Sequence, residues 1–288
     1  MSIPNKLASG EFLILAEMEP PKGVDVSCMV ANATRVKGKV DAFVVPEMSN
    51  AVMRMSSLGG CMLLQSKGLE TIMQVCCRDR NRLALQADLL AAQALGISSV
   101  MAVTGQDPSF GDHHRARAVH DVDLLELLEA IQKLESGRDM AGIELRGAPR
   151  FCVGSTVNAG ASGGALELEI EEMDRKMTAG VEFFVTPPVF DLQTFGRFMK
   201  RVGDRKTRII PTVLLLKSVG MARYIQRHMD HATIPEDLIR RIQQAPDKVR
   251  ECVRIAAELV SGIRDADYSG VLISTIGWED KLPDILEV

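Results

Sequence analysis

Residues 12–23 read FLILAEMEPPKG and decide the fold class. The start of this segment is continuously apolar, which is typical of a strand covered on both faces in a parallel sheet. An open dinucleotide-binding sheet follows its first strand with the pattern G-x-G-x-x-G. Here the strand is followed by Pro20-Pro21-Lys22 instead, so the segment indicates a parallel sheet of another kind.

Seven further apolar runs continue this pattern along the chain. The eight expected strands cover residues 12–18, 42–46, 71–77, 99–104, 151–155, 182–186, 208–215 and 270–275. Segments with helical periodicity separate them, at residues 81–95, 124–134, 166–179, 192–202, 219–228 and 249–263. Such alternation forms either a closed (β/α)8 barrel or a doubly wound open sheet. The count of eight and the lack of a Gly-, Ser- or Pro-rich linker favour an α/β TIM barrel, with residues 1–288 as a single domain.

The composition of the 288 residues argues against several classes of protein. Lys and Arg total 34 and Asp and Glu total 38, so the net charge is −4 and no nucleic-acid-binding surface is expected. The best apolar candidate, residues 89–103, is interrupted by polar residues and is shorter than the ~18 residues of a membrane span. The start of the chain lacks an apolar signal core, so we expect a cytoplasmic protein whose mature form is the whole chain.

The six cysteines and five histidines do not suggest a metal site. The cysteines show no C-x-x-C spacing, so we expect reduced and mostly buried thiols. His113 and His114 are adjacent in a polar segment, where a solvated loop is favoured over a pair of metal ligands.

Ionisable side chains follow the expected carboxyl ends of several strands, where the active sites of barrel enzymes lie. They include Glu17, Glu19, Glu47, Asp79, Lys217 and Glu279. Some have structural alternatives: Asp79 as the N-cap of a helix, Glu47 as a solvated loop carboxylate, and Lys176 as a cation that complements a helix dipole.

Glu17 lies within the apolar run of the first strand, where burial of an unpaired carboxylate is costly. Because side chains alternate along a strand, Glu17 and Glu19 are expected to point the same way, into the barrel. Desolvation and the neighbouring carboxylate would both raise the pKa of Glu17. A raised pKa suits a general acid that works near neutral pH.

The opening segment and several later motifs resemble the methylenetetrahydrofolate reductase family. In that family an acidic residue three before the first proline, here Glu17, is the catalytic acid. Further motifs follow in the family's order from about Phe12 to beyond Tyr224: RDRNR (78–82), LGI (95–97), VTGQDP (103–108), GDH (111–113), DVD (121–123), RKMTAG (175–180), FVTPPVFD (184–191) and IPTVLLL (210–216).

The resemblance implies flavin-dependent reduction of 5,10-methylenetetrahydrofolate to 5-methyltetrahydrofolate, with Glu17 as general acid for opening of the folate ring. It implies FAD as the cofactor, NAD(P)H or an electron-transfer partner protein as the electron source, and allows a homo-oligomer. The implied cofactor-binding residues are Thr104, Gly105, Gln106, His120, Asp121, Thr156, Glu169, Arg175 and Lys176, with Lys176 pairing the pyrophosphate. The implied substrate-binding residues are Glu17, Gln106, Pro187 and Ile225.

Five positions depart from the residues usual in the family. Gln106 stands for an aspartate, Pro187 for a glutamine, Pro46 for a threonine, Gln74 for a histidine, and Ser155 or Thr156 for an aromatic. Retention of Glu17 and Lys176 favours a catalytic reductase. The five changes favour the alternative, a non-redox folate-binding or structural subunit of a methyl-transfer or electron-transfer assembly.

Overall fold

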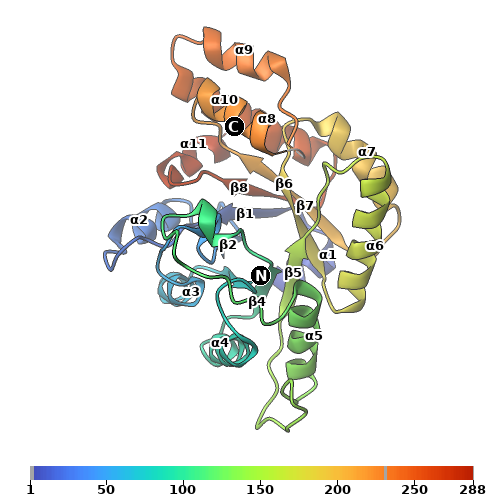
Figure 1. The fold of residues 1–288 in the computed structure, drawn as a ribbon. Helices are drawn as coiled ribbons and strands as arrows, with labels where there is room; N and C mark the ends of the chain where they lie inside the picture. Colours follow the sequence, from blue (N-terminus) through green and yellow to red (C-terminus); the bar gives the residue numbers. More distant parts are fainter. Residues whose placement is uncertain (1–2, 230–231, 288) are drawn as a thin grey trace.

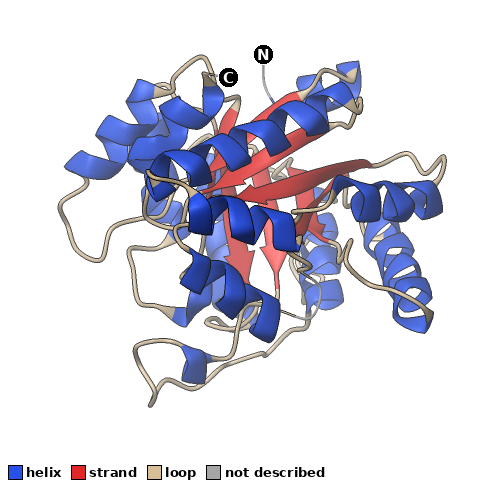
Figure 2. Cartoon of the chain, turned by 90° about the horizontal axis from the view of Figure 1, so that it is seen from above, coloured by secondary structure: helices blue, strands red, loops and turns tan. Residues whose placement is uncertain are grey.

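The structure, a computed structural model, describes residues 3–229 and 232–287. Its parallel strands form a closed barrel in which consecutive strands pair and β1 pairs with β8 (Figure 1). The strands are β1 (Leu13–Glu17), β2 (Ala42–Val45), β3 (Thr71–Cys76), β4 (Ser99–Val103), β5 (Cys152–Thr156), β6 (Phe183–Pro188), β7 (Arg208–Leu214) and β8 (Gly270–Ser274). Helices surround these strands (Figure 2). The predicted (β/α)8 barrel is confirmed.

The six predicted helices are present with ends shifted by two residues or fewer. The α-helices are α1 (Ile3–Ser9), α2 (Ser27–Arg35), α3 (Ser57–Gln65), α4 (Arg82–Ala94), α5 (Leu124–Glu135), α6 (Gly164–Thr178), α7 (Leu192–Val202), α8 (Val219–His228), α9 (Glu236–Gln244), α10 (Lys248–Asp265) and α11 (Leu282–Leu286). Three 3-10 turns are η1 (Ser49–Ala51), η2 (Pro108–Phe110) and η3 (Glu279–Lys281). The sequence did not predict α1, α2, α3, α9 or α11, which have five to nine residues and too few turns for a clear apolar stripe.

Side chains that point into the barrel form a core of their own. Leu13 and Leu15 of β1 belong to this inner core. Helix α1 covers the amino-terminal end of the barrel, because Ile3 and Leu7 are 1% and 8% exposed and pack in the same cluster. Glu17 follows Leu15 by two residues, so it points inward at the carboxyl end, as predicted.

A larger core fills the space between the strands and the outer helices. The first turns of these helices are held by side-chain caps. Asn81 caps α4 by accepting a hydrogen bond from the Ala84 N–H at 3.1 Å. The expectation that Asp79 is this N-cap is therefore wrong.

Strand β6 contains a bulge at its two prolines. Val185 pairs with Ile210 and Pro188 with Thr212, so β6 holds one extra residue. Proline lacks an N–H and is tolerated within a sheet at such bulges. Thr186 adds two hydrogen bonds between β6 and β7 at this bulge. Its Oγ1 accepts from the Thr212 N–H at 3.2 Å, and its carbonyl accepts from the Thr212 hydroxyl at 2.6 Å.

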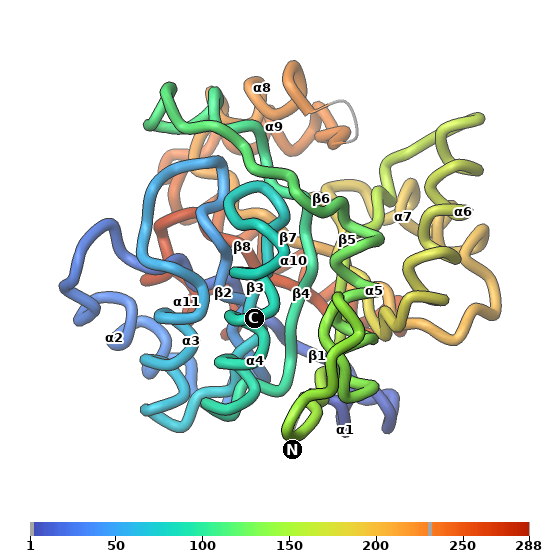
Figure 3. The backbone as a smooth tube through the Cα atoms, turned by 60° about the horizontal axis from the view of Figure 1, so that its bottom comes forward, coloured from blue at the N-terminus to red at the C-terminus, as the bar shows by residue number. Residues whose placement is uncertain are grey.

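The last elements of the chain return to the first ones. The tube in Figure 3 ends in red at α11, on the side of the barrel that carries the blue α2. Arg35 of α2 donates a hydrogen bond to the carbonyl of Asp280 in η3 at 3.4 Å. The contact joins α2, which follows β1, to the segment that follows β8.

All six cysteines are free, and only Cys28 is exposed. His113 Nδ1 lies 2.8 Å from Asp112 Oδ1, and His114 is exposed. Within residues 3–229 and 232–287, no group of three His, Cys, Asp or Glu side chains is arranged to hold a metal ion. No helix in the same ranges combines the length and apolarity needed to cross a membrane.

Candidate active site at the carboxyl end of the barrel

Glu17 is the last residue of β1 and lies at the mouth of the barrel. The register pairs Ala16 with Ile273, so Glu17 and Ser274 come next to each other on neighbouring strands. Ser274 Oγ donates a hydrogen bond to Glu17 Oε1 at 2.9 Å. The Glu17 side chain is partly exposed, so a ligand at the mouth can reach it.

The surroundings of Glu17 favour its protonated form. The pKa of Glu17 is raised to about 7, chiefly by desolvation; the Ser274 hydroxyl opposes this rise, and the carboxylates of Glu19 and Glu279 add to it. Burial is the largest cause, since a carboxylate loses hydration there. The rise expected from the sequence is found, with the same two causes.

Glu19 lies in a different electrostatic setting from Glu17. Arg54 Nη2 lies 2.8 Å from Glu19 Oε2, and Ser49 Oγ donates to Oε1 at 2.5 Å. Glu17 makes no ion pair with any residue in the described ranges. Glu19 therefore has a cationic partner in Arg54 whereas Glu17 has none among the described residues, so the two carboxyl groups are suited to different roles.

Glu47 and Arg78 form a buried charged network beside the mouth. They are 5% and 2% exposed, so the expectation of a solvated Glu47 is wrong. Glu47 tolerates burial because Arg80 Nη1 lies 3.0 Å from its Oε1. Arg78 pairs with Asp79 at 2.6 Å and also donates to the carbonyl of Gln106 at 3.2 Å. The network links the ends of β2, β3 and β4.

Thr104, Gly105 and Gln106 follow β4 and are exposed at the mouth. Gly105 has a φ of +87°, and a Cβ atom there would lie 2.4 Å from Cys76 Sγ. Only glycine fits this close approach without strain. The Gln106 side chain makes no hydrogen bond within the described part of the chain, so its amide is available to a ligand.

Lys176 is a buried residue of α6, 3% exposed. Its Nζ lies 2.7 Å from Glu172 Oε1 and donates to the carbonyl of Thr156 at 3.0 Å. This lysine therefore connects α6 to the end of β5. Its structural role goes beyond the favourable interaction with the helix dipole that the sequence offered as an alternative. Both contacts are internal, so Lys176 would have to exchange one of them to pair with a pyrophosphate. Arg175 beside it is exposed.

Three other predicted cofactor-binding residues lie in the loops after β4 and on α6. Glu169 Oε1 accepts from the Asn158 N–H at 2.7 Å. Asp121 pairs with Arg82 at 3.0 Å. His120 is exposed and has a φ of +41°, which is rare for a residue with a side chain. Two of the three thus support loop structure, and His120 presents its ring to solvent.

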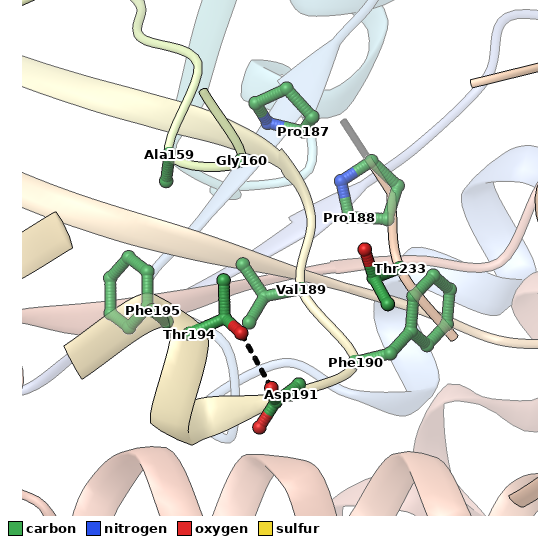
Figure 4. A pocket seen from close by; sticks show the side chains of 10 residues that line it. All are labelled: Ala159, Gly160, Pro187, Pro188, Val189, Phe190, Asp191, Thr194, Phe195 and Thr233. Carbon is green, nitrogen blue, oxygen red and sulfur yellow. Dashed lines mark hydrogen bonds between the residues drawn. The ribbon is translucent and has the colours of Figure 1, made fainter. Parts of the chain in front are cut away.

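Pro187 lines a small pocket beside the end of β6. The cavity of about 40 Å³ is enclosed by Ala159, Gly160, Pro187, Pro188, Val189, Phe190, Asp191, Thr194, Phe195 and Thr233 (Figure 4). Thr194 Oγ1 donates to Asp191 Oδ2 at 2.6 Å in its wall. Glu17 is not among the lining residues. The pocket is therefore separate from the acid, and its volume suits a few water molecules better than a folate or a flavin.

Ile225 of α8 is 4% exposed and packs in the outer core. The structure therefore does not support its expected contact with substrate. The exposed aromatic of this helix is Tyr224, which is 63% exposed and has its ring 4.4 Å from that of His228.

Two groups near Glu17 were missed by the sequence analysis, Ser274 and Arg54. Ser274 stands 257 positions from Glu17, and only the closure of the barrel brings the two together. Lys217, already noted at a strand end, donates to the Ile276 carbonyl and lies 5.1 Å from the Trp278 ring centroid. Desolvation lowers the pKa of Lys217, against the opposing effects of nearby carboxylates.

The fold and this mouth define a (β/α)8 barrel with a carboxyl group of raised pKa, Glu17, at the carboxyl end of its strands. A sequence profile described as Methylenetetrahydrofolate reductase matches residues 2–287. The chain belongs to the methylenetetrahydrofolate reductase family.

Two individual proteins show how far this similarity extends. "Methylenetetrahydrofolate reductase 2" of Schizosaccharomyces pombe is 23% identical over 257 residues, which cover 84% of this chain and 39% of the yeast protein. The chain thus spans well under half the length of that relative. A solved structure is described as "Uncharacterized protein from Clostridium thermocellum binds two copies of 5-methyl-5,6,7,8-tetrahydrofolic acid". It superposes with a TM-score of 0.65 at 12% identity, covering 99% of this chain and 96% of its own, and shows the shared fold.

Proposed function

We propose that the protein reduces 5,10-methylenetetrahydrofolate to 5-methyltetrahydrofolate with a flavin, and that Glu17 is the general acid. The observation that carries this proposal is the Glu17 carboxyl group, which faces the mouth, has no cationic partner in the described residues and has a pKa of about 7. Family membership and the tetrahydrofolate bound by the Clostridium thermocellum protein support folate as the substrate.

Glu17 would protonate the ring nitrogen of the substrate that becomes an amine when the five-membered ring opens. The proton moves from the carboxyl group to that nitrogen, and Glu17 becomes a carboxylate. Ring opening leaves an iminium carbon, which is the acceptor of a hydride. The Glu19 carboxylate, which pairs with Arg54 at the same mouth, would stabilise the positive charge of this iminium.

The end of β4 would hold the ring system of FAD. Gly105 lets the backbone approach closely, and the Gln106 amide is unpartnered within the described residues. His120 and Arg175 are exposed and available to the rest of the cofactor, whereas Lys176 is already engaged. FAD would supply the hydride that the protein itself cannot provide.

A spectrum of the purified protein and an anaerobic assay test the proposal together. We expect absorption near ~450 nm from bound flavin and conversion of methylenetetrahydrofolate with NADH, NADPH or a reduced electron-transfer protein. A protein that binds no flavin even when FAD is added would overturn it.

One observation favours a second candidate, a non-redox folate-binding subunit. Lys176 and Asp121, both implied as cofactor contacts, are occupied by Glu172 and Arg82. Calorimetric titration separates the two functions, since the second predicts folate binding by a colourless protein that does not take up FAD.

A further inference from the structure

Ser274 is built rigidly into the sheet beside Glu17. It is the last residue of β8 and is 6% exposed. Its carbonyl accepts a hydrogen bond from the Leu215 N–H at 2.9 Å, which holds this end of β8 against β7. The backbone that carries the Ser274 hydroxyl is therefore held in place by the sheet, unlike that of a residue on a loop.

The hydroxyl engages only one of the two oxygens of Glu17. Ser274 Oγ donates to Oε1 at 2.9 Å. In residues 3–229 and 232–287, no side chain or backbone N–H bonds to Oε2, and the Glu17 side chain is partly exposed. One oxygen is thus held by the sheet, and the other is left for a ligand.

We propose that Ser274 is a positioning residue that directs the Glu17 proton to Oε2 and adjusts the pH at which this carboxyl group releases it. The proposal rests on the proposed function for its catalytic meaning. While Oε1 accepts from the serine, the proton is held on Oε2 and leaves from there to the substrate nitrogen. The same hydrogen bond then stabilises the carboxylate that remains.

Other charged groups around Glu17 act in the opposite sense to Ser274. Glu19 lies two residues beyond the end of β1 and Glu279 lies in η3, and both disfavour ionisation of Glu17. Lys217 of the β7 end lies near these two carboxylates, and Arg54 pairs with Glu19. Among the described residues, Ser274 is the group that lowers the pKa of Glu17 against the effect of burial. Removal of its hydroxyl should therefore raise that pKa.

The test is a titration of Glu17 itself, in the folded protein with flavin added if it binds. A ¹³C-glutamate label or the infrared carboxyl band reports ionisation, and Glu17→Gln assigns the signal. In Ser274→Ala we expect the midpoint to move up by about one pH unit, a tenfold stronger hold on the proton, because one hydrogen bond to the carboxylate is lost. Ser274→Thr retains a hydroxyl and should restore the original midpoint.

The proposal is overturned if Ser274→Ala titrates like the parent protein, or if Ser274→Thr shifts as far as Ser274→Ala. The pH profile of folate reduction provides the second measurement, and its alkaline limb should move up with the titration. A shifted titration in a protein that reduces no folate would uphold the role of Ser274 and reject the proposed function. Near-identical melting temperatures of the parent, Ser274→Ala and Ser274→Thr exclude a folding defect in either variant.

Discussion

At the scale of single residues, Glu17 combines features that rarely coincide in a structural carboxylate. It lies at the end of an apolar strand, faces the barrel mouth, and has the nearby carboxylates Glu19 and Glu279 but no cationic partner in the described residues. A purely structural glutamate at such a site would be expected to have a cation beside it, as Glu47 has Arg80. The comparison within one molecule supports a chemical role for Glu17.

Replacing Glu17 with Gln should lower the rate of folate reduction by about 10²–10⁴-fold, the usual value of a general acid. Flavin content and reduction of the flavin by its donor should remain near the parent values, because the proton is needed only in the folate step. In the parent, the rate should fall above about pH 7, where Glu17 ionises. Stopped-flow measurement of each half-reaction checks both statements, and folate turnover by the Gln variant at the parent rate would disprove the role.

Gln106 should raise the reduction potential of a bound flavin relative to a Gln106→Asp variant. An aspartate beside the reduced cofactor adds a second negative charge, and like charges ~4 Å apart repel by about 4 kcal/mol at an effective dielectric constant near 20. Because Gln106 is exposed, solvent will screen much of this repulsion. The neighbouring Asp107 carboxylate is engaged in capping η2, where it accepts from the Ser109 N–H at 2.8 Å. Spectroelectrochemical titration of both proteins decides the matter: equal midpoints, or a higher one in the Asp variant, contradict the assignment.

At the scale of elements, α6 is tied to β5 through one buried lysine. Lys176→Ala would leave the Thr156 carbonyl without its donor and remove a packed side chain, so we expect a loss of about 1–3 kcal/mol in the free energy of unfolding. The implied cofactor role adds a second expectation, weaker retention of FAD. Urea unfolding and FAD titration of the apoprotein measure the two effects. Glu171→Ala is the matched control, since this side chain of the same helix is exposed, makes no ion pair within the described residues and has no expected cofactor contact.

Unchanged FAD affinity in Lys176→Ala, together with lower stability, would assign this lysine to the fold alone. Loss of FAD affinity with unchanged stability would instead show that its two internal contacts give way to the cofactor. Both measurements are needed because the structure shows Lys176 fully engaged with Glu172 and Thr156.

The elements that the sequence could predict are those whose pattern is local. Strands with continuous apolar runs and helices of ten or more residues follow from periodicity within a short window, and α7 and α8 have the predicted ends. Shorter helices such as α9 lack that signal. The bulge at Pro188 and the pairing of Glu47 with Arg80 depend on neighbouring strands, so no local pattern contains them.

At the scale of the whole molecule, the candidate site also could be predicted only where its residues form a local sequence pattern. The sequence identified Glu17, because a carboxylate inside an apolar run is visible in one strand. It could not identify Ser274 as its partner, since their contact exists only after β8 closes on β1. The sequence also predicted a solvated Glu47, and this was wrong. The burial of a loop residue depends on the loops that pack over it, which no local pattern contains.

The closed barrel also separates stability from chemistry along its axis. Helix α1 covers the amino-terminal end, and Leu7 packs there in the inner core at 8% exposure, while Glu17 and the β4 loop occupy the opposite end. Leu7→Ala should therefore lower the free energy of unfolding by about 2–5 kcal/mol, the usual effect of emptying a buried leucine site. The titration midpoint of Glu17 and the rate of folate reduction at 20 °C should stay at the parent values, provided the variant is folded at that temperature. Leu168→Ala, a change at a side chain that is 65% exposed, serves as the control and should leave stability nearly unchanged. A shift of the Glu17 midpoint in Leu7→Ala would show instead that packing at the closed end reaches the mouth through the inner core.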